Sequence, residues 1–178
     1  MRIEHPPDSG MSGIELRQLE RTDLESWLEY LTIPEVIEHT SWAVQKPEDL
    51  LPLFASYESD ASSSPRRLAI IDASSGRLAG TIGFHTISDV NRSAEIAYDL
   101  APTYWGRGIA TAMCRRVTEW AFVNLGYIRV QATVLETNRA SERVLQKALF
   151  KYEGLLQSYR MVRGHPGNFK MYARVVAP

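Results

Sequence analysis

The sequence predicts one mixed α/β domain in which a single, largely antiparallel sheet is flanked by helices. The chain has 178 residues, of which 44% are hydrophobic and 23% charged, and this suits one globular domain with its own core. Stretches with the alternating pattern of strands are interleaved with stretches of helical period. Their order is strand, helices, three strands, helix, strand, helix and two strands, which is typical of this fold class.

The amino-terminal third begins with a segment that has no apolar stretch. Residues 1–13 contain two prolines and two glycines and predict a flexible leader, so we expect the domain itself to span residues 14–176. The polar stretch 59–67 lacks an apolar anchor and predicts a mobile loop. Between these segments, one strand and three helical stretches are expected over residues 14–19, 22–31, 34 onward and 47–58.

The rest of the chain supplies most of the sheet. A long helix is expected from the glycine-containing stretch 104–113 to about Leu125, with apolar residues at helical spacing on one side. Asn138 is a preferred helix N-cap and predicts a second helix. The two closing strands are joined by a turn at residues 163–168. The predicted strands are 68–72, 78–87, 94–100, 127–135, 151–162 and 169–176.

The stretch "YWGRGIATAM" at residues 104–113 is the strongest sign of a ligand site. Gly106 and Gly108 are poor helix formers placed where a helix begins, so their backbone freedom must serve another purpose. A glycine-rich turn that enters a helix presents several main-chain N–H groups to one point, where the helix dipole adds positive charge. Arg107 adds a cation. The stretch therefore predicts a phosphate-binding turn.

Three kinds of phosphate site compete for this stretch. A P-loop needs Gly-Lys-Ser/Thr, which the stretch lacks. The dinucleotide fingerprint is Gly-x-Gly-x-x-Gly/Ala placed directly after a strand. Here Thr111 stands at the third small position, and Pro102 separates the strand from Gly106. The fingerprint also needs a ribose-binding acidic residue about 20 residues after its first glycine. Glu136, which ends the next strand, lies further than that from Gly106. The third kind is a site for the diphosphate of an acyl-CoA.

Three motifs resemble those of one enzyme family. "YWGRGIATAM" resembles the coenzyme A loop of the GNAT (GCN5-related N-acetyltransferase) family, and its Tyr-Trp-Gly-Arg-Gly form resembles the RimJ/RimL-like branch that acetylates ribosomal proteins. "AEIAYDL" at 94–100 and "NRASERVLQKALFKYEG" at 138–154 resemble two further motifs of that branch. The chain departs from the patterns at Trp105, where Gln or Arg is usual, and at Ala97 and Leu149, where Gly is usual.

The resemblance, which runs from about residue 14 to 176, implies a GNAT domain that uses acetyl-CoA as its cosubstrate. It implies direct attack of a primary amine on the thioester in a ternary complex, with no metal ion. The amine would belong to a protein N-terminus or to a small molecule. The residues that it places at the cofactor are Tyr98, Leu100, Trp105, Gly106, Arg107, Gly108, Ile109, Ala110, Thr111, Asn138 and Ser141.

The chemistry of acetyl transfer suggests further roles. A primary amine is protonated at neutral pH, so a base helps it to attack, and the departing thiolate gains from an acid. Glu95 is the first candidate for the base, with His85 or water as alternatives. The resemblance makes Ser141 the candidate acid, with Tyr152 second. A main-chain N–H of residues 96–100, where the resemblance implies a strand splayed beside the cofactor, would stabilise the oxyanion.

Other features bound the partners. Trp42 and His85 are predicted to line the acceptor pocket. A net charge of −1 gives no case for nucleic-acid binding, and no run of about 18 apolar residues predicts a membrane span. We expect a cytoplasmic protein, and the strand edges near the carboxyl terminus make a homodimer a candidate assembly.

Three alternatives stay open on the sequence alone. One is a catalytically inactive module that binds acyl-CoA, and another is a nicotinamide-dependent oxidoreductase. The third is a transferase that forms an acyl-cysteine on Cys114, the single cysteine. Cys114 lies in mid-helix with no His nearby in the sequence, so a buried apolar role is expected for it.

Overall fold

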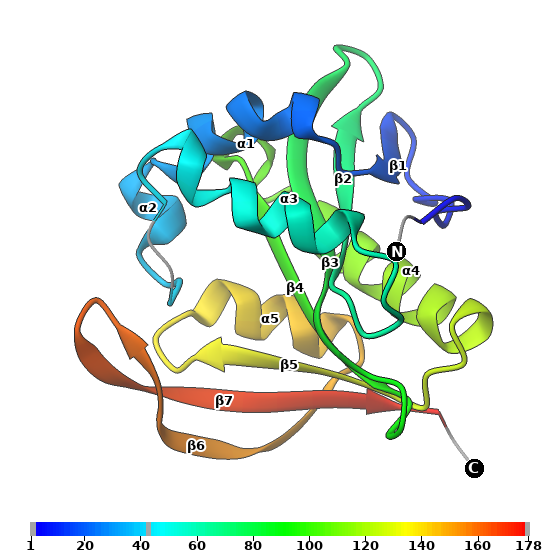
Figure 1. Cartoon of the computed structure of the whole chain (residues 1–178). Helices are drawn as coiled ribbons and strands as arrows, with labels where there is room; N and C mark the ends of the chain where they lie inside the picture. Colours follow the sequence, from blue (N-terminus) through cyan, green and yellow to red (C-terminus); the bar gives the residue numbers. More distant parts are fainter. Residues whose placement is uncertain (1–2, 42–43, 177–178) are drawn as a thin grey trace.

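A seven-stranded sheet organises the computed structural model, which describes residues 3–41 and 44–176 (Figure 1). Every neighbouring pair of strands is antiparallel except β4 and β5, so the mixed, mostly antiparallel sheet is confirmed. Across the sheet, the strands lie in the order β1 (Ile14–Gln18), β2 (Arg66–Asp72), β3 (Arg77–Ser88), β4 (Ser93–Leu100), β5 (Arg129–Leu135), β7 (His165–Val175) and β6 (Lys151–Val162).

The helices begin where the sequence permits a helix start. Pro34 and Pro52 lie in first turns, where the missing N–H of proline costs no hydrogen bond. Asn138 caps its helix, because its Oδ1 accepts from the main-chain N–H of Ser141 at 3.0 Å. The helices are α1 (Leu24–Leu31), α2 (Pro34–Ile37), α3 (Leu51–Glu58), α4 (Ile109–Asn124) and α5 (Arg139–Lys147).

The sheet separates two hydrophobic cores. In β2, Leu68 and Ile70 belong to the core beneath α4 and α5, whereas Ala69 and Ile71 belong to the core beneath α1 and α3. This division follows from the alternation of side chains along a strand. Both faces of β2 are therefore covered, and its apolar run reads as a fully buried strand.

The single parallel pair is short. β4 pairs with β5 only where Ser93–Glu95 face Arg129–Gln131. Beyond Glu95 the two strands diverge, as Figure 1 shows for the green β4 and the yellow β5. The main-chain groups of residues 96–100 on that side consequently have no partner strand among the described residues.

One segment differs from the sequence-based expectation, and another holds a buried residue. In the segment predicted as a flexible leader, Ile3 is 7% exposed in the larger core, and its N–H donates to Gln18 Oε1 at 2.9 Å. The flexibility of this segment stays a prediction. The predicted loop at 59–67 ends early, since Arg66 and Arg67 are buried and already belong to β2. None of the helices in the described ranges is long and apolar enough to cross a membrane.

The end of α5 is strained at one residue. The N–H groups of Leu149 and Phe150 donate to the carbonyls of Gln146 and Leu145, the paired bonds of a Schellman turn. Leu149 takes the left-handed position of that turn with φ of 68° and is 59% exposed. A branched side chain is disfavoured there by about 1–2 kcal/mol, and glycine is the usual occupant.

Leu149→Gly is therefore expected to stabilise the protein. Relief of the left-handed strain outweighs the larger backbone entropy of glycine in the unfolded chain, for a net gain of about 0.5–1 kcal/mol. Thermal unfolding should shift upward by a few degrees. Leu149→Ala is the matched control, because it removes the same exposed side chain but keeps the strain, and it should bring no gain. A lower Tm for the glycine variant would contradict this account.

Candidate functional site: a turn of free amides beside a gap in the sheet

The turn between β4 and α4 has the backbone that its glycines permit. Gly106 and Gly108 have φ of 74° and 77°, in the left-handed region. No atom lies within 4 Å of a Cβ built at either position, so the glycines are needed for conformation and not for space. Trp105, which is 46% exposed, ties the turn to β4 because its Nε1–H donates to the Leu100 carbonyl at 2.8 Å.

The main-chain N–H groups of residues 106–111 are unpaired. Within 3–41 and 44–176, no group accepts a hydrogen bond from any of these six, and the first helical bond is donated by Ala112 to Gly108. The unpaired donors share the positive end of the 16-residue helix α4. No side chain caps the helix, so the donors remain available to an anion.

The predicted cofactor residues of this turn are not equivalent. The side chain of Ile109 is 3% exposed and packs in the larger core, so only its main chain faces the turn. The guanidinium of Arg107 lies over the ring of Tyr104 at 5.3 Å. Arg107 also lines a hollow of about 280 Å³ together with Asp72 and Met11. Ala110 and Thr111 continue the first turn of α4 with partly buried side chains.

The divergence of β4 and β5 leaves a cavity of about 160 Å³. One end is lined by Tyr98, Asn138 and Ser141, which the sequence placed at the cofactor. Burial raises the pKa of Tyr98, and its hydroxyl donates to the Ser141 carbonyl at 3.3 Å. The side chain of Ser141 also lies within hydrogen-bond reach of the Tyr98 hydroxyl, at the edge of the cavity.

A buried carboxylate lies behind the cavity. Glu95 is 4% exposed, and its Oε1 accepts from Thr133 Oγ1 at 2.6 Å and from Arg160 at 3.0 Å. His85 Nε2 lies 3.3 Å from the same oxygen. Burial alone raises the pKa of Glu95, but the hydrogen bonds from His85 and Thr133 and the charges of His85 and Arg160 lower it to about 2. Glu95 is therefore ionised throughout the neutral range.

His85 reaches the cavity because of an irregularity in β3. Phe84 pairs with Ile96 and Thr86 pairs with Glu95, which leaves His85 as the extra residue of a β-bulge. The side chain of His85 is 36% exposed and lines the cavity. When Nε2–H donates to Glu95, Nδ1 keeps a lone pair that can accept a proton. The sequence named both residues but gave no sign of the bulge.

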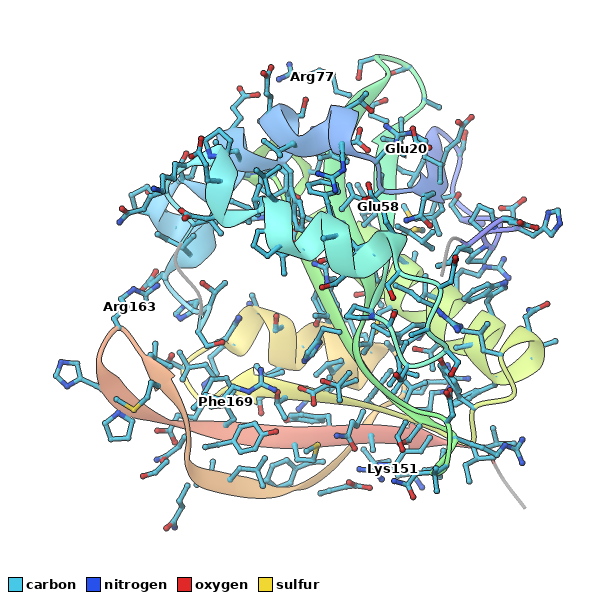
Figure 2. All side chains as sticks on the ribbon, in the orientation of Figure 1. Glu20, Glu58, Arg77, Lys151, Arg163 and Phe169 are labelled. Atoms are coloured by element: carbon cyan, nitrogen blue, oxygen red, sulfur yellow. The ribbon has the colours of Figure 1, made fainter. Side chains whose placement is uncertain are left out.

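The other end of the cavity is formed by segments far apart in the chain. His39, Thr40 and Ser41 follow α2, while Arg160 and Phe169 come from β6 and β7. Figure 2 shows Arg163 at the tip of the β6–β7 hairpin, and its guanidinium donates to the carbonyls of Ile37 and Glu38. The hairpin is thereby fastened to the segment that follows α2. Trp42, predicted to line this pocket, lies outside the described residues.

Two alternative reactive residues lie elsewhere. Cys114 is fully buried, and burial raises the pKa of its thiol to about 12, so the thiol is protonated and unable to act as a nucleophile. Tyr152 is 55% exposed on β6 and packs against the ring of Tyr172 at 5.5 Å. Tyr152 is not among the residues that line the cavity.

A buried network that the sequence did not indicate supports the free part of β4. Asp99 accepts from Arg67 at 2.5 Å, from Thr81 at 2.9 Å and from Tyr30. The same Arg67 donates from Nη1 to the Ala97 carbonyl at 3.0 Å. These bonds fix the position of β4 without using the edge that faces β5. That edge is left to face the cavity.

Comparisons with known proteins agree with this geometry. The family model described as "Acetyltransferase (GNAT) domain" matches residues 14–151. The uncharacterized N-acetyltransferase YoaA of Bacillus subtilis is 39% identical over 98 residues, which are 55% of each chain. The putative ribosomal N-acetyltransferase YdaF of the same organism is 37% identical over 89 residues, or 50% of this chain and 49% of YdaF. The aligned part thus spans about half the length of these two relatives.

A solved structure shares the fold across nearly the whole chain. The spermidine N-acetyltransferase of Vibrio cholerae, solved in complex with CoA and spermine, superimposes with a TM-score of 0.81 at 23% identity. The superposition covers 93% of this chain and 96% of the other. At this identity the likeness shows a common architecture.

Proposed function

We propose, from the premise that this chain belongs to the GNAT acetyltransferase family, that it transfers an acetyl group from acetyl-CoA to a primary amine in a ternary complex. The six unpaired main-chain N–H groups of residues 106–111, beside a gap in the sheet, carry the proposal. We also propose membership of the RimJ/RimL-like branch, which the Tyr-Trp-Gly-Arg-Gly motif and the ribosomal relative support. The nicotinamide alternative is excluded by the family match.

The residues present fit acetyl-CoA. The unpaired amides of residues 106–111 would hold its diphosphate, and acetyl-CoA supplies an activated acetyl thioester. The main-chain groups of Leu100 face the gap between β4 and β5. Its carbonyl accepts from Trp105, whereas the N–H of the next residue, Ala101, donates to β3. By alternation, the main-chain groups of Tyr98 also face the gap. These two N–H groups are the proposed donors to the acyl end and to the oxyanion.

The proton transfers are assigned to residues of the cavity. We propose that His85 accepts the proton of the amine at Nδ1 and that Glu95 is a positioning residue, which holds Nε2 and so fixes the orientation of the ring. This differs from the first sequence-based choice of Glu95 as the base, because a carboxylate with a pKa of about 2 binds protons weakly at neutral pH. Ser141 is the proposed proton donor to the leaving thiolate.

Calorimetry with acetyl-CoA tests the cofactor site. Gly108→Ala forces a side chain into the left-handed region, which displaces the amides, so we expect acetyl-CoA to bind about tenfold more weakly. Gly76→Ala is the matched control, since Gly76 has φ of 68°, open space around its Cβ position and a place in the β2–β3 turn. It should be equally strained and bind normally.

Two results would count against this proposal. Equal affinity of both glycine variants would mean that the amides of residues 106–111 do not hold the diphosphate. If the wild type binds acetyl-CoA but releases no thiol with any amine, the chain is a binding module and not an enzyme. Thiol release that depends on added amine is the expected result.

A further inference from the structure

We propose that Arg160 forms a carboxylate-binding subsite for the acceptor and that the preferred acceptors are primary amines that carry a carboxylate. This inference rests on the proposed function, since it concerns the acceptor end of the same cavity. It follows from the charges that line that end and from the way in which the guanidinium is held.

The described lining of the cavity is basic. It contains His39, His85 and Arg160 and no aspartate or glutamate. Glu95 is 4% exposed and already accepts hydrogen bonds from Arg160 and Thr133. Glu38, which is 67% exposed, lies 3.9 Å from His39 but does not line the cavity. An acceptor with a second ammonium group would therefore meet the Arg160 guanidinium and no lining carboxylate to pair with. An acceptor with a carboxylate would meet complementary charge.

Arg160 is held ready for such a group. Its Nη2 donates to Glu95, and no other hydrogen bond of its guanidinium is found in the described residues. Its plane is fixed by the rings of Tyr159 and Phe169, at 5.0 and 5.8 Å from the guanidinium carbon. The side chain is 32% exposed. A guanidinium in a fixed plane with unpaired N–H groups suits the two oxygens of a carboxylate.

The same charges would assist the reaction. A cation near an amine disfavours the ammonium form and lowers the pKa of the amine. Arg160 and a proton-accepting His85 on one side of the cavity would thus favour the neutral nucleophile. The carboxylate of the acceptor would be attracted to the Arg160 guanidinium. A simple amine or a diamine has no group that gains this attraction.

Matched acceptors test the inference. We would compare 5-aminopentanoate with n-pentylamine and 1,5-diaminopentane, by calorimetry in the presence of CoA and by thiol release with acetyl-CoA. The wild type should favour the carboxylate by about tenfold to a hundredfold in both measurements, as expected for one charge-assisted pair. Arg160→Gln should remove this preference, and Arg160→Lys, which keeps the charge beside Glu95, should fold and retain part of it.

Arg129→Gln is the matched control. Arg129 also pairs with a glutamate, its side chain is 29% exposed, and it does not line the cavity, so the preference should persist. A preference for the diamine, no detectable binding of the carboxylate at millimolar concentration, or an equal loss for all three acceptors in Arg160→Lys would overturn the inference. Carboxylate-selective binding without thiol release would support the subsite and refute the transferase, so the two failures are distinguishable.

Discussion

Replacement of His85 by Gln should lower kcat for acetyl transfer by about 10²–10⁴-fold, with little change in the affinity for acetyl-CoA. Glutamine can still donate to Glu95, but it offers no lone pair that accepts a proton near neutral pH. Because the pKa of Glu95 is about 2, the carboxylate is ionised at pH 7 and cannot cause a change of rate in the neutral range. A fall of kcat at acidic pH in the wild type, absent in the variant, would identify His85 as the base.

His39→Gln is the control for this experiment. His39 also lines the cavity and is 31% exposed at its side chain, but it contacts Thr137 and not Glu95. We expect it to change KM for the amine and to keep the pH profile. Glu95→Gln should lower kcat and keep the acid limb, because it weakens the contact that orients His85 and leaves the imidazole in place. If the pH profile of His85→Gln matches that of the wild type, His85 is not the base and water removes the proton from the amine.

Arg67→Ala should destabilise the protein by about 3–5 kcal/mol, because it leaves the buried carboxylate of Asp99 without its cation. Arg67 and Asp99 are 7% and 10% exposed at their side chains, so water cannot replace the lost partner. The Ala97 carbonyl also loses a donor. Denaturant unfolding measures the effect, and the midpoint should fall while the slope stays constant.

The comparison variant is Arg21→Ala. Arg21 makes two hydrogen bonds to Glu58, which projects from α3 at the surface (Figure 2). Both side chains of this pair are about half exposed, so solvent screens the pair and its loss should hardly change stability. Similar effects of the two variants would show that Arg67 and Asp99 do not act as a buried pair.

Local sequence signals predicted the order of the elements and the turn before α4. Asn138 was predicted as a cap because its side chain bonds to the main chain only three residues away. Gly106 and Gly108 predicted the turn because glycine favours a backbone conformation that other residues avoid. The resemblance also marked Leu149 as standing in a glycine position, and the structure gives the physical meaning of that departure: a left-handed φ of 68°.

Features that depend on pairing between distant segments escaped prediction. Arg160 meets Glu95 across 65 positions of the chain, and Arg67 meets Asp99 across 32. Neither meeting leaves a periodic trace in the sequence. The last strand was predicted from residue 169, but β7 begins at His165. Pro166 is tolerated there because β5 pairs only with residues 169–175 of β7. The edge of β7 that faces away from β6 therefore has no partner strand at Pro166, and the missing N–H of proline costs no hydrogen bond.

The bulge in β3 has a consequence for how this protein can change over time. Ile82, Phe84 and Ile87 belong to one core although their spacing is two and then three residues. The additional residue, His85, resets the phase of the strand between Phe84 and Ile87. Deletion of residue 85 would return Phe84 and Ile87 to the ordinary spacing of two, with Thr86 still opposite Glu95 and Ile87 opposite Ala94. Position 85 can therefore be substituted or lost without a change of strand register, so the need for the extra residue lies in the proposed chemistry and not in the sheet.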